Sequence, residues 1–208
     1  FGGTSTTTDL PLPNFLHLTC PSQYRFALPN ESEDAFAKRL AAELEATIQA
    51  EGPDTIAAMI AEPLMGAGGV MPPPRGYFQE VQKVLKKHGI LLIADEVVCG
   101  FGRLGYDTGC EAYGIQPDVM TFAKGITSSY VPMGAVALSP HVADVVAEGS
   151  EGGIFGHGYT FGGHPVACAV ALECLGIYQD QGVKANTRAR ADELLGGLLG
   201  VCRGSWMV

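Results

Sequence analysis

The sequence has few basic residues and no long apolar run. Of its 208 residues, 13 are Lys or Arg and 22 are Asp or Glu, which gives a formal net charge of −9. Nucleic acids and acidic membranes are bound by concentrated basic surfaces, so this balance argues against both as partners. Apolar runs such as residues 56–60 and 90–94 are too short to cross a bilayer, and no signal-peptide pattern opens the chain. We therefore expect a soluble globular protein without a membrane anchor.

The cysteines lack the spacing of a metal site or of a disulfide framework. No C-x-x-C pair occurs, and no His stands at zinc-ligand spacing from a Cys. Thiols that stay reduced are typical of the cytosol. We therefore expect a cytoplasmic protein that binds no metal. Its six cysteines are Cys20, Cys99, Cys110, Cys168, Cys174 and Cys202.

Most of the chain alternates patterns typical of strands with patterns typical of helices. Residues 1–30, which are rich in Pro, Thr and Asn, predict an extended or loop segment, and residues 31–208 predict part of one α/β domain. Continuous apolar runs are typical of strands buried on both faces of a mainly parallel sheet. The sequence predicts four such strands, over residues 55–61, 90–94, 118–123 and 134–139.

Apolar residues at helical spacing predict the flanking helices. Asn30 is a candidate N-cap for the first helix, with Glu33 as its capping-box partner, and Gly52-Pro53 ends that helix. The second helix begins near Tyr77 and ends at Gly89, after a basic last turn that suits the helix dipole. Three further helices are predicted over residues 140–147, 165–178 and 185–199.

Three of the predicted strands end in polar side chains, namely Glu62, Asp95 and Lys124. In a parallel sheet, ligands gather at the carboxyl ends of the strands. A lysine held there, directly before the flexible Gly125, suits an amine that forms an imine with a carbonyl, provided that the amine is neutral near pH 7. Taken alone, Lys124 reads as an ordinary solvated loop lysine, and an aspartate after a strand commonly caps the next turn.

The combination of motifs is more specific than any one of them. Asp95-Glu96-Val97 is followed by Gly100-Phe101-Gly102-Arg103, by Lys124-Gly125 at 29 residues after Asp95 (124 − 95), and by Pro132-Met133-Gly134-Ala135. Together these segments resemble the signature of the class III aminotransferases, which use pyridoxal 5'-phosphate (PLP). Two flanking segments, Ala61-Glu62-Pro63 and Tyr159–Pro165, resemble further parts of the same family.

The resemblance implies a role for each matching residue. Lys124 holds PLP as a Schiff base and moves a proton during the reaction, Asp95 pairs with the pyridine nitrogen, and Val97 packs against the ring. A carboxylate beside the ring nitrogen keeps that nitrogen protonated, so that the ring withdraws electrons well. Glu96 is expected to point away from Asp95, because neighbours on a strand face opposite sides.

The remaining matches imply a homodimer with its active sites at the subunit interface. Thr160, followed by Phe161, resembles the segment whose threonine binds the cofactor phosphate of the neighbouring subunit, and Glu62 belongs to the same cofactor-binding set. A simpler interpretation is that Thr160 and Phe161 form a turn that leads into the helix starting at Pro165. Arg103 fits a substrate or phosphate contact and a structural salt bridge equally well.

The resemblance also implies a fold and a reaction. The fold is the large domain of a fold type I PLP enzyme, mainly parallel and flanked by helices, and incomplete at both ends because family members are longer. The reaction moves an amino group from an amine or omega-amino acid to an oxo acid such as pyruvate, as in the omega-amino-acid:pyruvate aminotransferases. The alternatives are a PLP-dependent aminomutase, racemase or decarboxylase on the same fold, or a truncated, noncatalytic α/β interaction domain.

Overall fold

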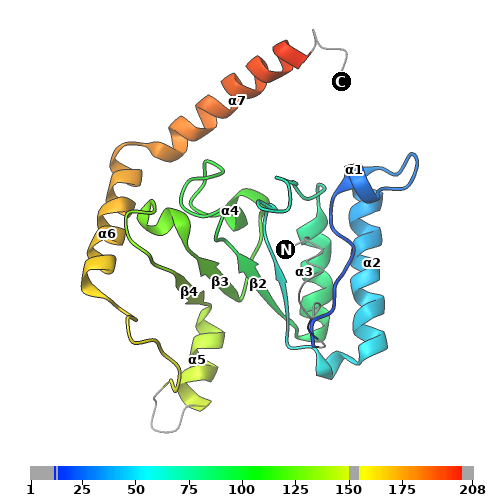
Figure 1. Ribbon diagram of the computed structural model, residues 1–208. Coiled ribbons are helices and arrows are strands. Elements are labelled where there is room, and N and C mark those ends of the chain that lie inside the picture. The colour runs from blue at the N-terminus through cyan, green and yellow to red at the C-terminus, as the bar shows by residue number, and fades with distance from the viewer. Residues whose placement is uncertain (1–11, 13, 150–154, 203–208) are drawn as a thin grey trace.

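The computed structural model describes residues 12, 14–149 and 155–202. Within these ranges, four strands form one sheet, with helices beside it and beyond its edge (Figure 1). The strands are β1 (Ala58–Ala61), β2 (Leu91–Asp95), β3 (Val119–Phe122) and β4 (Ala135–Leu138). The helices are α1 (Gln23–Phe26), α2 (Glu33–Glu51), α3 (Tyr77–His88), α4 (Gly109–Tyr113), α5 (Pro140–Gly149), α6 (Pro165–Asp180) and α7 (Val183–Cys202), with 3₁₀ turns η1 (Pro53–Thr55) and η2 (Lys124–Thr127).

The sheet is mainly parallel, as the sequence predicts. Its strand order is β1-β2-β3-β4, in which β1, β2 and β3 run parallel and β4 runs antiparallel to β3. The register pairs Ala61 with Ala94 and Asp95 with Thr121, so the first three strands end at the same edge. Strand β1 begins three residues later than predicted, because η1 takes up the chain between α2 and the strand.

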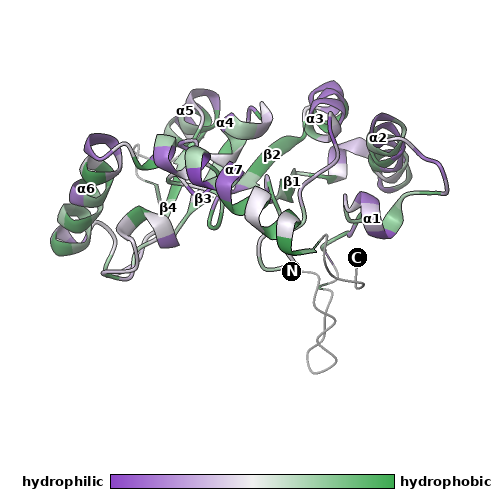
Figure 2. Ribbon diagram, turned by 90° about the horizontal axis from the view of Figure 1, so that it is seen from above, coloured by the Kyte–Doolittle hydropathy of each residue, from purple (hydrophilic) through white to green (hydrophobic). Residues whose placement is uncertain are grey.

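The core lies between one face of the sheet and helices α2 and α3. These two helices lie side by side on that face (Figures 1 and 2). In α2 the apolar side chains that recur every four residues, Phe36, Leu40, Leu44 and Ile48, are buried. Gly89 ends α3 in the left-handed conformation that suits a glycine. The large side chains buried in this core include Phe36, Leu40, Leu44, Ile48, Tyr77, Phe78, Val81, Leu85, Ile90 and Leu92.

The opposite face of the sheet is apolar and open to solvent. Register places Ile60, Ile93, Val119 and Leu138 in one row across all four strands. Ile60 is 57% exposed and Leu138 is 42% exposed, whereas the two central members are half-buried. The sheet therefore has one packed face and one accessible face in the described part of the chain.

The predicted N-cap of α2 was wrong, and two short helices, α1 and α4, were not predicted. The N-cap of α2 is Ser32, whose hydroxyl accepts from the Ala35 amide, because Asn30 lies in a turn with a φ of 62°. Within the segment predicted as loop, residues 23–26 form the single turn α1, and residues 1–11 lie outside the described ranges. Helix α4 has only five residues, too few to show an apolar period.

Helix α7 extends away from the body of the molecule, above the carboxyl edge of the sheet (Figure 1). Its 20 residues include none that is buried. Among the described ranges, no helix combines the length and the apolar character that crossing a membrane requires.

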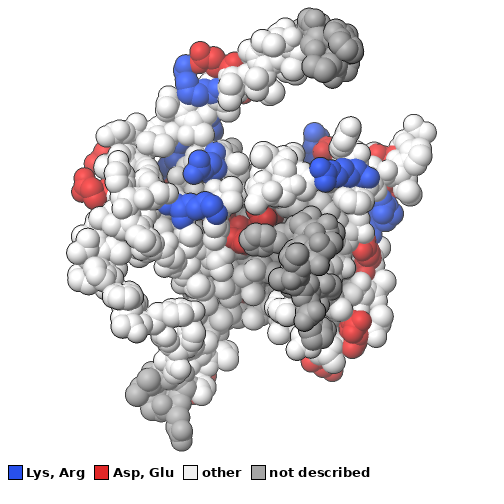
Figure 3. Space-filling model, in the orientation of Figure 1, with Lys and Arg blue, Asp and Glu red and all other residues white. Residues whose placement is uncertain are grey.

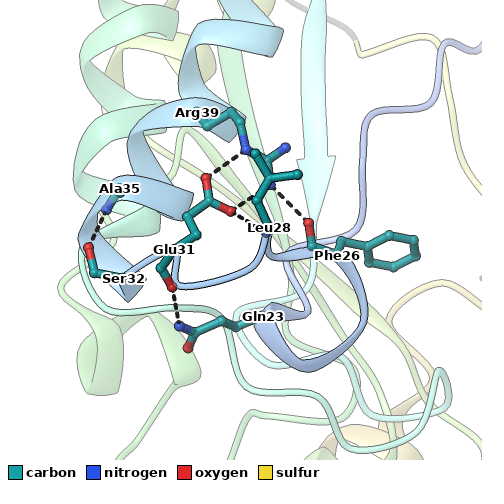
Figure 4. Close-up of polar contacts among 7 residues, drawn as sticks. All are labelled: Gln23, Phe26, Leu28, Glu31, Ser32, Ala35 and Arg39. Atoms are coloured by element: carbon teal, nitrogen blue, oxygen red, sulfur yellow. Dashed lines mark hydrogen bonds and ion pairs between the residues drawn. The ribbon is translucent and has the colours of Figure 1, made fainter.

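A carboxylate–guanidinium pair ties the loop before α2 to the helix itself (Figure 4). The Arg39 guanidinium donates to both oxygens of Glu31, through Nε at 2.7 Å and Nη2 at 2.8 Å, and also to the carbonyl of Phe26 at 2.9 Å. The Leu28 amide donates to the same carboxylate at 2.9 Å. The bidentate pair with Arg39 is the main reason that the pKa of Glu31 falls from 4.5 to about 2.

We expect the Glu31 contacts to make the stability of the protein depend on pH. Because the folded-state pKa lies below the ordinary value of 4.5, this stabilisation is complete above pH 4.5 and is lost as the pH falls towards 2. Glu31→Gln should therefore unfold at a lower urea concentration than the unaltered protein near neutral pH. The difference between the two urea midpoints should shrink as the pH falls from 4.5 towards 2. Glu51→Gln, at the exposed end of α2, is the control, and a gap of constant size would contradict the prediction.

Candidate functional site

The three polar residues at the predicted strand ends meet at one edge of the sheet. Glu62 directly follows β1, Asp95 is the last residue of β2, and Lys124 stands two residues after β3. Since these strands are parallel and in the register given above, their carboxyl ends lie next to one another. The structure thus confirms that the sequence brings these three positions to a single edge.

Asp95 is held by one of its two carboxylate oxygens. Its Oδ1 accepts from the Val97 amide at 3.0 Å and from the Thr121 hydroxyl at 3.3 Å. The first bond caps the turn after β2, which confirms the interpretation that this aspartate caps the turn after its strand. Among the described residues no hydrogen bond reaches Oδ2, and the side chain is only half-buried. A fixed carboxylate with one free oxygen can accept a further hydrogen bond from a ligand.

The loops after β1 and β2 pack closely against each other. Glu62 Oε2 accepts from the Gly66 amide at 2.8 Å, so this carboxylate closes the loop that follows β1. A Cβ at Gly66 would lie 2.7 Å from Val98 Cγ1, which explains why the residue beside Val98 is a glycine. Val97, the neighbour of Val98 in the sequence, is half-buried beside the Asp95 turn.

Glu96 has a different role from Asp95. Its side chain is fully buried, and its two oxygens accept from the amides of Gly109 at 2.8 Å and Cys110 at 2.6 Å, at the start of α4. The expectation that it points away from Asp95 agrees with these separate sets of partners. Thr108 caps the same helix through the amide of Glu111, and this Thr-x-x-Glu spacing is the sequence signal from which α4 could have been found.

Two buried thiols lie behind this edge. Cys99 donates to the carbonyl of Leu64 at 3.3 Å, and burial raises its pKa to about 11. Burial also raises the pKa of Cys110, with the nearby Glu96 carboxylate adding to the effect. Both groups therefore stay protonated and unreactive at neutral pH, and they serve as packing.

Lys124 begins the turn η2, and its side chain is exposed. Within the described ranges its amine makes no hydrogen bond and no ion pair, so no structural role competes with a ligand for it. Beside it is a cavity of about 400 Å³, a size within the range of small-molecule sites. Asp95 is not part of this cavity, whose lining is Phe101, Gly102, Arg103, Lys124, Gly125, Ser128, Ser129, Tyr178, Val183 and Thr187.

The surroundings of the cavity are basic, although the chain as a whole is acidic. Lysine and arginine side chains gather between the sheet and α7, with acidic groups next to them (Figure 3). Arg103 and Lys124 line the cavity, Lys184 pairs with Asp107 at 2.6 Å, and Arg188 donates to the carbonyl of Gly105. Arg103 forms no salt bridge with any described residue, so its positive charge remains available to an anion such as a phosphate or a carboxylate.

Thr160 and Phe161 do not join Lys124 in the same chain. They form a turn before α6, in which the His164 amide donates to the carbonyl of Phe161, and Phe161 is 78% exposed. Tyr178, at the other end of α6, contacts the residue after Lys124. Because a helix rises about 1.5 Å per residue, the 13 residues from Pro165 to Tyr178 separate the two ends by roughly 20 Å. The interpretation as a turn is confirmed, and a role toward the cofactor stays a prediction.

No group of three or more His, Cys, Asp and Glu side chains in the described ranges is arranged to hold a metal ion. The chemistry available at this edge is instead that of an unpaired amine, a half-satisfied carboxylate and a basic cavity. An amine of this kind can bond covalently to a carbonyl compound, and the carboxylate can hold a protonated ring nitrogen.

Comparison with known proteins extends this description. The family model for Aminotransferase class-III matches residues 1–203. A gamma aminobutyrate transaminase 3, chloroplastic, from Solanum lycopersicum is 56% identical over 176 residues, which is 84% of this chain and 34% of the relative. A probable gamma-aminobutyrate transaminase 3, mitochondrial, from Oryza sativa subsp. indica is 51% identical, over 91% of this chain and 38% of the relative.

The solved structures that resemble this chain are also transaminases. The omega transaminase from Pseudomonas jessenii, crystallised in complex with PMP, is 55% identical and superposes with a TM-score of 0.83, over 86% of this chain and 40% of that one. A transaminase solved with L-Ala superposes with a TM-score of 0.91 at 47% identity, over 95% of this chain and 47% of that one. The chain therefore spans less than half the length of these relatives, and it shares their fold over the part that it spans.

We expect Glu96 to be essential for the structure of this edge. Glu96→Gln replaces one of the two accepting oxygens with an NH2 group, which is a donor. One backbone N–H at the start of α4 would then lose its acceptor and remain buried, so the variant should lose about 1–3 kcal/mol of unfolding free energy. Thermal or urea unfolding measures the loss. Glu111→Gln is the matched control, because Glu111 accepts from a backbone amide on the exposed side of the same helix. Equal stability of the two variants would contradict this role for Glu96.

Proposed function

We propose that the whole protein is a PLP-dependent aminotransferase, because the chain belongs to the class-III aminotransferase family. It would move an amino group from an amine or omega-amino acid to an oxo acid such as pyruvate. The observation that carries the proposal is the common edge at which β2 ends in Asp95 and β3 leads into Lys124, within a chain that matches the family along almost its whole length.

The residues at this edge fit PLP. The cofactor needs an amine for its aldehyde, a carboxylate for its ring nitrogen and positive charge near its phosphate. Lys124 supplies an amine that makes no hydrogen bond or ion pair with a described residue. Asp95 supplies a carboxylate oxygen, Oδ2, to which no described residue donates. Arg103 adds positive charge nearby. The related omega transaminase binds PMP, the amine form of the same cofactor.

When bound, PLP supplies an electron-withdrawing ring that stabilises the negative charge left when a proton leaves the substrate carbon. Lys124 Nζ would anchor the cofactor covalently, and the same nitrogen, once released, would take that proton and return it. Asp95 Oδ2 would accept from the ring N–H, while Thr121 and the Val97 amide hold Oδ1 in place. Val97 would fix the plane of the ring from one side.

The proposal includes a homodimer in which each active site uses residues of both subunits. Thr160 would donate its hydroxyl to the phosphate in the neighbouring subunit, with Phe161 beside it. Their exposure, and the roughly 20 Å between the two ends of α6, support a role outside their own chain. Glu62 would contribute to the cofactor site by holding the loop after β1.

The names of the relatives favour amino transfer over the other PLP reactions. All those cited above are transaminases, whereas an aminomutase, a racemase or a decarboxylase would share the cofactor site without transferring the amine. The unpaired Lys124 amine and the half-satisfied Asp95 carboxylate favour catalysis over a noncatalytic interaction domain. A cytoplasmic location remains a prediction from the cysteine content, and the named plant relatives are chloroplastic or mitochondrial.

Removal of the Lys124 amine should abolish covalent PLP binding and transamination together. In Lys124→Ala, made in the protein at its natural length, we expect no visible absorbance of bound cofactor and a loss of turnover of roughly 10²–10⁴-fold or more, because no other group can anchor PLP and move the proton. Absorbance and pyruvate consumption measure the two effects. Lys86→Ala, on the exposed side of α3, serves as control, and normal turnover in Lys124→Ala would refute the proposal.

Neutralising Asp95 should separate cofactor binding from catalysis. Asp95→Asn keeps an oxygen for Val97 and Thr121 but removes the negative charge at the ring nitrogen. We therefore expect covalent PLP binding to persist while turnover falls on the order of 10²- to 10³-fold. Asp54→Asn, in η1, is the matched control and should retain full turnover. Unchanged turnover in Asp95→Asn would rule out its pairing with the ring nitrogen.

A further inference from the structure

The turn that carries Lys124 has an unfavourable backbone conformation. Three residues other than glycine lie there in the left-handed region, Lys124 with φ 45°, Ser128 with φ 48° and Ser129 with φ 63°. Such residues cost conformational free energy and persist only where surrounding contacts hold them. The contacts around η2 therefore determine where the lysine amine is presented.

One side of the turn is held by the loop after β2. A Cβ added at Gly125 would lie 3.1 Å from Phe101 Cβ and 3.3 Å from the carbonyl oxygen of Gly100. Phe101 in turn contacts Phe122, at the end of β3, with their ring centroids 5.2 Å apart. The loop after β2 therefore packs directly against the turn and leaves no room for a side chain at position 125.

Tyr178, on α6, holds the other side through a hydrogen bond. Its hydroxyl donates to the carbonyl of Gly125 at 2.7 Å, across 53 residues of sequence. A phenol has only one proton to donate, so in the contact between Ser128 and Tyr178 it is the serine hydroxyl that donates. The result is a short chain of hydrogen bonds, from Ser128 through Tyr178 to Gly125, that closes the turn on itself. Tyr178 also lines the cavity beside Lys124.

We propose that Tyr178 is a positioning residue for Lys124. Its hydroxyl fixes the carbonyl directly after the lysine, and with it the strained turn from which the amine reaches the cavity. This role rests on the proposed function, because it gives the lysine the geometry for capturing the PLP aldehyde. Tyr178 itself does not need to touch the cofactor.

The first test is hydrogen exchange in the protein at its natural length and without PLP. Tyr178→Phe removes only the hydroxyl, and we expect the amides of residues 125–130 to exchange roughly three- to tenfold faster, as expected for one lost hydrogen bond. Tyr24→Phe, which removes a fully exposed hydroxyl from α1, is the matched control and should leave exchange unchanged. Equal exchange rates at residues 125–130 in Tyr178→Phe and in the unaltered protein would overturn the proposal.

The second test follows covalent capture of PLP against PLP concentration. We expect the maximal capture rate of Tyr178→Phe to fall roughly three- to tenfold while the half-saturating PLP concentration stays the same. A change in both would indicate general disruption and would overturn a specific positioning role, as would an unchanged rate. If the unaltered protein captures no PLP, the proposed function fails as well, which distinguishes that outcome from the failure of Tyr178 alone.

A second variant keeps the proposal testable if Tyr178→Phe does not fold. Ser128→Ala removes the hydroxyl that donates to Tyr178 but leaves the bond from Tyr178 to Gly125 in place, so exchange should rise and capture should fall, each by no more than about twofold. A larger effect in Ser128→Ala than this would move the positioning role from the tyrosine to the serine and would overturn the proposal.

Discussion

The parallel pairing of β1, β2 and β3 is the constraint on which the rest of the site depends. Hydrogen bonding in register sets Asp95 opposite Thr121, and this makes the end of β2 and the start of the Lys124 turn neighbours. A shift of one residue would turn the Asp95 carboxylate to the face that now packs against α2 and α3. The apolar side chains on that face, such as Leu92 and Ala94, therefore fix the position of Asp95 and of the Lys124 turn while they build the core.

Two adjacent carboxylates at this edge have different partners, because successive side chains of an extended chain point to opposite sides. Glu96 is buried and holds the amides at the start of α4, while Asp95 is half-buried and keeps one oxygen for a ligand. Burial of the first is tolerated because both of its oxygens are satisfied by backbone N–H groups. A buried structural carboxylate and a carboxylate with one free oxygen are thus neighbours in the sequence with opposite surroundings.

Much of this arrangement could be predicted from the sequence, since apolar runs and helix signals are local. The four strands, the helices α2 and α3, and the placing of Glu62, Asp95 and Lys124 at strand ends all follow from such patterns. The support for the lysine does not, because Tyr178 reaches Gly125 across 53 residues and nothing in the local sequence links them. The antiparallel pairing of β4 with β3 was likewise not predicted, because an apolar run does not show the direction of a strand. The roles proposed for Asp95 and Lys124 come from the family resemblance, because local patterns leave them ambiguous.

The central claim is that one sheet edge brings an amine and a carboxylate to opposite ends of a single pyridine ring. A crystal structure of the protein at its natural length, grown with PLP, tests this most directly. The account predicts continuous density from Lys124 Nζ to the cofactor and a ring nitrogen within about 2.7–3.2 Å of Asp95 Oδ2. Cofactor density joined to another lysine, or a ring nitrogen that faces a group other than Asp95, would contradict it.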